Sequence, residues 1–202
     1  MDSFYSVPTN KIYTSEIEIN KSRFLGFAKY ADTVQSAQNF VQQIREKFRD
    51  ARHVVYAYVV DGMQKSSDDG EPSGTAGRPM LGFLQNKNCE HIVVVVVRYF
   101  GGIKLGAGGL LRAYLSSAQK TVESNLALFL RGRKFNAGLE YNEYNQFLQK
   151  IKNKMIKITK TEFLNKIELE FVCFEDFDIP NSEFLGDVFD TMEAKDANNR
   201  TA

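Results

Sequence analysis

Residues 91–99 read His-Ile-Val-Val-Val-Val-Val-Arg-Tyr, and this stretch decides the fold. Every position from Ile92 to Val97 is apolar, whereas a strand with one face in water alternates apolar and polar residues. Both faces of this segment must therefore be covered, which predicts a central strand of a sheet packed by helices or by a second layer. The run is too short to cross a bilayer, so we expect no membrane span.

A glycine-rich segment follows this strand and leads into a helix. It reads Phe100-Gly-Gly-Ile-Lys-Leu-Gly-Ala-Gly-Gly, and apolar residues then recur with helical spacing from Leu110 to Val122. Each glycine inside a helix costs about 1 kcal/mol relative to alanine, so the bare backbone should serve a purpose. Its N–H groups, with Lys104 and Arg112, could bind a phosphate-like anion, or the glycines could let the helix pack closely on the sheet. Neither a Walker loop nor a dinucleotide fingerprint is present.

Upstream of the central strand, the apolar pattern predicts four further features. Alternation from Ile12 to Tyr30 indicates two antiparallel strands joined by a turn at residues 20–22. Helical spacing then begins after Thr33, a good N-cap residue, and should end near Ala51. Residues 53–60 alternate as a strand, and residues 61–82, rich in Gly, Ser, Asp and Pro, predict a long loop.

The loop carries the densest group of polar side chains in the chain, at residues 66–79. Its carboxylates Asp68, Asp69 and Glu71 could hold a divalent cation or act as acid/base groups, with His53 as a general base. The structural alternative is that the acids cap a short helix near residues 76–84 or pair with Arg98, and that His53 is an ordinary strand residue. Because His and Cys residues lack ligand spacing, we expect no transition-metal site.

The C-terminal part has its own element order. Its pattern predicts strands at 133–144, 156–163 and 167–174, a helix at 144–152 and a second helix at 182–192. This order indicates a small α+β sandwich with two helices on one face of a sheet.

Composition sets the limits on function. The 202 residues carry a formal net charge of +1, which excludes a uniformly basic nucleic-acid coat. Residues 1–125 have a net charge of +3, while residues 126–167 hold 9 basic and 3 acidic residues and residues 168–202 hold 2 and 10. If the basic residues of the second part share a face, they would extend a nucleic-acid surface. Two distant cysteines and an N-terminus without a leader pattern predict a cytoplasmic protein.

Four motifs, taken in order, resemble the YigZ/IMPACT family. They are Ser22-Arg-Phe, Ala51-Arg-His-Val-Val-Tyr-Ala-Tyr, the run from Asp68 to Pro79, and the run from Arg98 to Tyr114. The resemblance implies an IMPACT-type domain with the ribosomal protein S5 domain 2-like fold at 1–125 and a lead-in at 126–134. It further implies a ferredoxin-like (DUF1949-like) α+β domain at 135–194. The polar composition of residues 195–202 predicts a mobile tail. One departure is that no apolar segment after Met192 provides the last strand of a complete ferredoxin-like unit.

The resemblance also implies a role linked to the regulation of translation, without established catalytic residues. Eukaryotic IMPACT proteins act on a translation-control partner through a further N-terminal domain, so that partner is not carried over. Our first hypothesis is a module that binds RNA or the ribosome through a basic, glycine-lined surface formed by Arg23, Arg78, Arg98, Gly101, Gly102, Lys104, Gly106, Gly108, Gly109 and Arg112.

Two alternatives stay open. One is an enzyme acting on a phosphorylated or peptide-like small molecule through His53, Asp68, Asp69 and Glu71, with a divalent cation bound by the acids. The other is a protein-interaction scaffold in which both motifs are structural. No other cofactor is predicted.

Overall fold

The computed structural model describes residues 3–9, 11–177 and 182–191. The chain forms two compact units that meet in sequence between Ala127 and Leu128. The first unit contains the acidic loop and the glycine-rich segment. None of the described helices is long and apolar enough to span a membrane.

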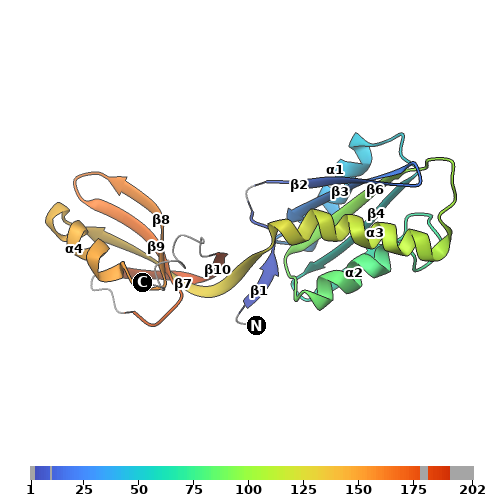
Figure 1. Ribbon diagram of the computed structural model, residues 1–202. Coiled ribbons are helices and arrows are strands. Elements are labelled where there is room, and N and C mark those ends of the chain that lie inside the picture. The colour runs from blue at the N-terminus through green and yellow to red at the C-terminus, as the bar shows by residue number, and fades with distance from the viewer. Residues whose placement is uncertain (1–2, 10, 178–181, 192–202) are drawn as a thin grey trace. The chain divides into compact units, whose positions relative to one another are not determined.

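The first unit is built on a five-stranded sheet (Figure 1). Its strands, in spatial order, are β2 (Tyr13–Ile19), β3 (Ser22–Tyr30), β6 (Ile92–Tyr99), β4 (His53–Val60) and β5 (Met63–Ser67). Each strand runs antiparallel to its neighbour, and the β2–β3 hairpin is the one that the sequence predicts. The apolar run of residues 92–97 therefore forms the central strand, as expected.

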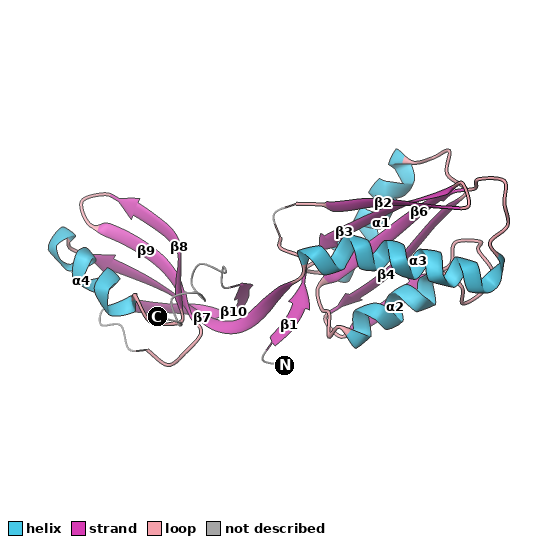
Figure 2. Cartoon of the chain, viewed as in Figure 1, coloured by secondary structure: helices cyan, strands magenta, loops and turns pink. Residues whose placement is uncertain are grey.

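Helices cover both faces of this sheet, which confirms the prediction from the unbroken apolar run (Figure 2). Val93, Val95 and Val97 pack in one cluster with α1 (Val34–Lys47). The alternate residues of β6 pack in a second cluster with α2 (Gly77–Asn86) and α3 (Gly106–Val122). Every residue from 92 to 97 is fully buried. Burying one such aliphatic side chain contributes about 1.5–3 kcal/mol, so this strand anchors the unit.

Local signals explain where the remaining elements begin. Thr33 caps α1, since its hydroxyl accepts a hydrogen bond from Ser36 N at 3.1 Å. The helix ends at Lys47, before the predicted limit at Ala51. The predicted loop 61–82 contains β5 and the start of α2. The short strand β1 (Ser3–Ser6) hydrogen-bonds to the backbone of Asn88 and Glu90, and η1 (Glu123–Asn125) follows α3.

The second unit has one described helix, α4 (Tyr141–Ile151), against a sheet in which β7 (Ala127–Leu139), β9 (Ile167–Cys173) and β8 (Ile156–Phe163) lie in that order. Residues 126–134, expected to lead into the first strand, lie largely within β7 itself. The core of the unit combines the inward faces of β7 and β9 with Phe147 and Ile151 of α4. The predicted tail at 195–202 lies outside the described residues.

The helix predicted at 182–192 is wrong, because residues 182–191 form strand β10, paired antiparallel with β7 (Ala127–Leu139). The apolar residues Phe184, Leu185, Val188 and Phe189 have a spacing that suits a helix. A bulge between Phe184 and Gly186, where Gly186 has a φ of 141°, shifts the strand alternation by one residue. With that shift, the apolar residues of the strand have a spacing that resembles that of a helix. The sandwich of two helices on one face is therefore replaced, in the described residues, by one helix and an added strand.

Candidate functional site

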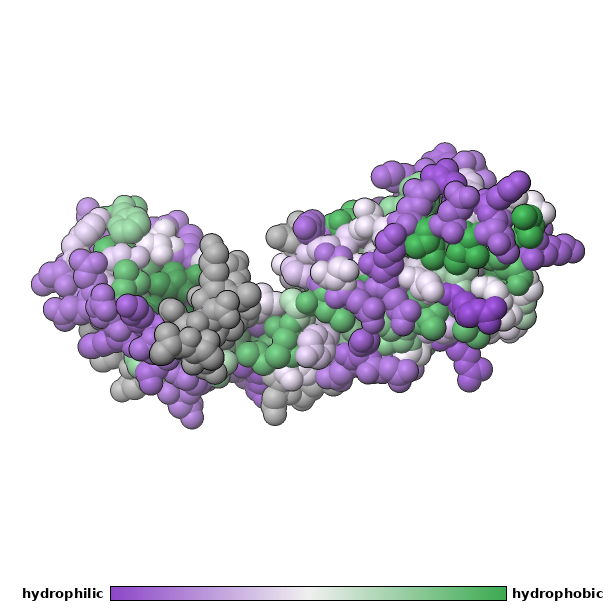
Figure 3. All heavy atoms as spheres, in the orientation of Figure 1, coloured by the Kyte–Doolittle hydropathy of each residue, from purple (hydrophilic) through white to green (hydrophobic). Residues whose placement is uncertain are grey.

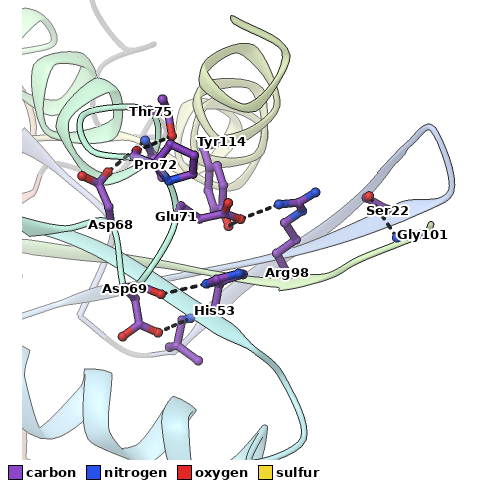
Figure 4. Close-up of polar contacts among 12 residues, drawn as sticks. Ser22, His53, Asp68, Asp69, Glu71, Pro72, Thr75, Arg98, Gly101 and Tyr114 are labelled. Carbon is purple, nitrogen blue, oxygen red and sulfur yellow. Dashed lines mark hydrogen bonds and ion pairs between the residues drawn. The ribbon is translucent and has the colours of Figure 1, made fainter. Parts of the chain in front are cut away.

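The acidic loop between β5 and α2 uses its first carboxylate to start a helix (Figure 4). Asp68 Oδ1 accepts hydrogen bonds from Ala76 N at 3.0 Å and Gly77 N at 2.8 Å, and Asp68 Oδ2 accepts one from Gly74 N at 2.8 Å. The residue at the N-cap position of α2, Ala76, has no side chain able to do this. Asp68 therefore caps α2 from a distance, as the structural alternative predicts.

The second carboxylate ties the loop to the other face of the sheet. Asp69 accepts a bidentate contact from Arg45 of α1, at 2.9 and 3.2 Å, and a hydrogen bond from Val54 N at 2.7 Å. His53 Nδ1 lies 2.8 Å from the backbone oxygen of Asp69. His53 thus holds the loop against β4, and its side chain is partly buried rather than displayed in an open site.

The third carboxylate lies in a buried polar network. Glu71 Oε1 accepts hydrogen bonds from Arg98 Nη1 at 2.6 Å and from the Tyr114 hydroxyl at 2.8 Å (Figure 4). The Glu71 and Arg98 side chains are 4% and 7% exposed, and Tyr114 is fully buried. Burial, and then the neighbouring charge of Glu71, raise the pKa of Tyr114 above its usual range, so its hydroxyl stays protonated and donates. The network joins the loop, the end of β6 and α3.

The three carboxylates therefore point to three different partners instead of one common point. Within residues 3–9, 11–177 and 182–191, no group of three His, Cys, Asp or Glu side chains is placed to hold a metal ion. Asp68, Asp69 and Glu71 are not gathered as the cation site or acid/base cluster of the enzyme hypothesis requires. Their contacts match the structural alternative, in which the acids cap a helix and pair with Arg98.

The glycine-rich turn after β6 docks on the β2–β3 hairpin. Gly101 N donates to Ser22 Oγ at 3.1 Å, and a Cβ placed on Gly101 would lie 1.9 Å from the backbone carbon of Lys21. Only glycine allows this approach, so close packing explains Gly101. Gly102 and Gly106 have positive φ values of 87° and 69°, which explains their identity as well. Gly108 and Gly109 lie in the first turn of α3.

We call the surface that results the tip, formed by Lys21, Phe100, Ile103, Lys104 and Arg112. Phe100 is 57% exposed and Ile103 is 46% exposed, although both are large apolar side chains. The three cations are also exposed, and none of them has an ion pair among the described residues. Arg112 Nη1 would lie 3.7 Å from a Cβ on Gly108, so this side chain extends over the first turn of α3.

The other predicted cations have different positions. Arg98 is buried with Glu71, and its guanidinium carbon lies 5.6 Å from the centroid of the Phe24 ring and 5.5 Å from that of the Phe100 ring. Arg98 is therefore a buried contact of the exposed Phe100 ring and is not itself available to a ligand. Arg23 is exposed but pairs with Glu16 at 2.7 Å, and Arg78 lies on α2.

Sequence reasoning missed Phe100 and Ile103. For Phe100, the available signal was its place directly after the buried strand and before Gly101 and Gly102, in a turn that contributes no residue to the core. The sequence left open whether the basic residues of 126–167 share a face, and most of them form ion pairs with acidic side chains of the second unit. Ion pairs there include Arg131–Asp187, Arg133–Asp176, Lys134–Glu170, Lys154–Glu175 and Lys157–Asp190.

The acidic loop and the glycine-rich segment both lie inside a known domain. Residues 20–122, more than half of the chain, match the family model of the Impact N-terminal domain. The chain belongs to the YigZ/IMPACT family. This YigZ/IMPACT chain is 36% identical over 173 residues to an IMPACT family member of Haemophilus influenzae, and the match covers 82% of each chain.

Two other members of the family match over about half of this chain. IMPACT family member YvyE of Bacillus subtilis is 51% identical over 108 residues, which cover 52% of this chain and 50% of YvyE. Escherichia coli YigZ is 48% identical over 102 residues, or 48% of this chain and 50% of YigZ. The chain thus spans about half the length of these two relatives. A solved crystal structure, described only as that of a hypothetical protein, has a TM-score of 0.59 and 31% identity and covers 86% of each chain.

Proposed function

We propose that this YigZ/IMPACT chain binds RNA through the tip and that this binding serves the control of translation. The observation that carries the proposal is the tip itself, because one short segment, residues 100–104, exposes the ring of Phe100 and also Lys104, a cation without an ion pair among the described residues. Exposed aromatic rings stack on unpaired bases, and Lys and Arg side chains neutralise phosphates. The family resemblance supports the link to translation, which makes RNA, the ribosome or a translation protein the expected partner.

The same resemblance underlies the finer description of the fold. We propose that the first unit is a ribosomal protein S5 domain 2-like domain. We also propose that the second unit is a ferredoxin-like domain in which β10 takes the place of the second helix. The predicted cytoplasmic location fits a translation-linked role and remains part of this proposal.

The test measures the affinity of the full chain for a fluorescently labelled single-stranded RNA by anisotropy. If Lys21, Lys104 and Arg112 each neutralise one phosphate, raising the salt from about 50 to about 200 mM should weaken binding about 20-fold. Lys104→Glu combined with Arg112→Glu should weaken it at least about tenfold. Phe100→Ala should cost about 1–3 kcal/mol of binding free energy, the usual contribution of a stacked base.

A matched control is Lys65→Glu, which reverses an exposed charge on the edge strand β5. It should leave RNA affinity unchanged, because β5 lies at the sheet edge opposite to the β2–β3 hairpin. The proposal fails if no RNA binds at low salt, or if the control weakens binding as much as the tip variants.

A further inference from the structure

A groove of about 600 Å³ lies between α2 (Gly77–Asn86) and α3 (Gly106–Val122) of the first unit, apart from the tip residues. The C-terminal ends of the two helices are adjacent, since Lys87 and Glu123 just beyond them form an ion pair at 3.0 Å. The helices therefore run side by side in the same direction, and every fourth residue of each faces the groove. The residues at this spacing are Arg78, Gly82 and Asn86 from α2 and Leu111, Leu115 and Gln119 from α3.

The floor of the groove is apolar and open to solvent. Pro79, Phe83, Leu111 and Leu115 line it, and Leu111 is 39% exposed although α3 packs on the sheet. At Gly82, a Cβ would meet no atom within 4 Å. A glycine inside a helix is costly, and here it leaves the middle of the groove empty rather than relieving a close contact. Figure 3 views this side of the unit, where apolar residues (green) interrupt the polar surface.

Charge defines what the groove can accept. Among the described residues, neither Asp nor Glu lines it, whereas Arg78 stands near one end and Lys87 at the other. Arg78 is exposed and has no ion pair in the described part of the chain, and Lys87 has only the exposed pair with Glu123 there. The remaining polar side chains are the amides of Asn86 and Gln119. An apolar floor between cationic ends is complementary to an apolar stripe flanked by carboxylates.

We propose that the α2–α3 groove docks a short acidic amphipathic helix of a partner protein. A peptide bound as an added β-strand would need a sheet edge to pair with, and the walls here are helices. The stripe from Leu111 to Gln119 rises about 12 Å, which suits about two turns of helix with apolar residues at i, i+3, i+4 and i+7. RNA fits the groove poorly, because Phe83 is 6% exposed and offers no face for stacking. The site is independent of the tip and does not rest on RNA binding.

The experiment uses a labelled synthetic peptide of about 14 residues, with leucines at i, i+3, i+4 and i+7 and glutamates on both flanks. Its control is the same peptide with lysines in place of the glutamates. The full chain should bind the acidic peptide at least about tenfold more tightly than the basic one, because only the acidic one complements Arg78 and Lys87.

Three variants locate the binding site on the protein. Gly82→Leu fills the groove and should weaken binding at least about tenfold, whereas Gly82→Ala adds one methyl group to open space and should bind nearly as the unmodified chain does. Both replace a helical glycine and should keep the fold, which circular dichroism verifies. Arg78→Glu should weaken binding at least about fivefold, since it reverses the charge at one end.

Two outcomes overturn the proposal. The first is equal binding of the acidic and basic peptides, or of Gly82→Leu and the unmodified chain. The second is that neither peptide binds. If, in addition, Gly82→Leu weakens RNA binding, the groove is assigned to nucleic acid instead. RNA binding that fails in every variant leaves the peptide result intact, so the two proposals fail separately.

Discussion

Replacement of Glu71 by Gln tests whether the acidic loop is structural. The substitution keeps the shape of the side chain and removes its charge. The amide oxygen that replaces Oε1 can still accept from the Tyr114 hydroxyl, so the change isolates the ion pair with Arg98. Arg98 Nε is already buried without a hydrogen-bond partner among the described residues. Glu71 is therefore the one carboxylate that neutralises this guanidinium in the described structure.

The expected loss of unfolding free energy is large. Both side chains of the pair are more than nine-tenths buried, and removing one partner of a buried pair leaves an uncompensated charge. Such losses amount to about 3–5 kcal/mol. Because a domain is stable by about 5–15 kcal/mol, this single change should remove a substantial part of the stability of the first unit.

Urea unfolding followed by circular dichroism at the helical band measures this loss. Three of the four described α-helices belong to the first unit, so the signal reports mainly on it. Arg98→Met should be costly for the same reason, and the double variant should lose about 1–3 kcal/mol less than the sum of the single variants. Glu16→Gln, which removes an exposed pair with Arg23 that is also short at 2.7 Å, is the matched control and should change the midpoint far less.

Equal urea midpoints for Glu71→Gln and Glu16→Gln would refute a structural role for the buried pair. That role is also refuted if the double variant shows no coupling. A Glu71→Gln chain that folds normally but loses a measured turnover would instead support the enzyme hypothesis.

Three further predictions concern neighbouring features. Asp68→Ala should cost about 2 kcal/mol and speed hydrogen exchange at Ala76 N and Gly77 N, whereas unchanged exchange would contradict the capping role. Gly101→Ala should cost about 1–3 kcal/mol by urea unfolding and also weaken RNA binding, because its methyl group meets the Lys21 backbone; full stability would exclude that clash. Burial raises the pKa of Cys89 to about 12 and that of Cys173 to about 11, so a disulfide reagent at pH about 8 should label them only after unfolding. Because these pKa values are higher in the folded state than in the unfolded chain, the protonated thiols contribute their full stability below pH about 8. This contribution should decline as the pH rises above about 9, and urea midpoints at increasing pH would measure the decline.

Much of the first unit could be predicted from local pattern. Apolar alternation locates the β2–β3 hairpin, and the unbroken run of residues 92–97 identifies a strand with two covered faces. In the second unit the same reasoning fails at residues 182–191, because the bulge at Gly186 shifts the alternation and pairing with β7 decides the conformation. A bulge is set by the partner strand, which a local pattern does not include.

The structure separates the side chains of the acidic loop but leaves an exposed surface at the glycine-rich segment. The sequence named the acids Asp68, Asp69 and Glu71 but left open whether they meet, and their contacts with the α2 backbone, with α1 and with the end of β6 separate them. For the glycine-rich segment, the sequence pointed to Lys104 but missed the exposed ring of Phe100. Exposure depends on what other segments cover, and this cannot be calculated from spacing alone.

By itself the sequence determined the central strand, its covering on both faces and the resemblance to the YigZ/IMPACT family. These follow from the periodicity and order of residues, which are properties of the chain. Only the tertiary structure decided that Glu71 neutralises Arg98, that Gly101 packs on the Lys21 backbone and that α2 and α3 leave a groove at Gly82. These features depend on distances between residues far apart in the chain, which packing of the whole unit sets.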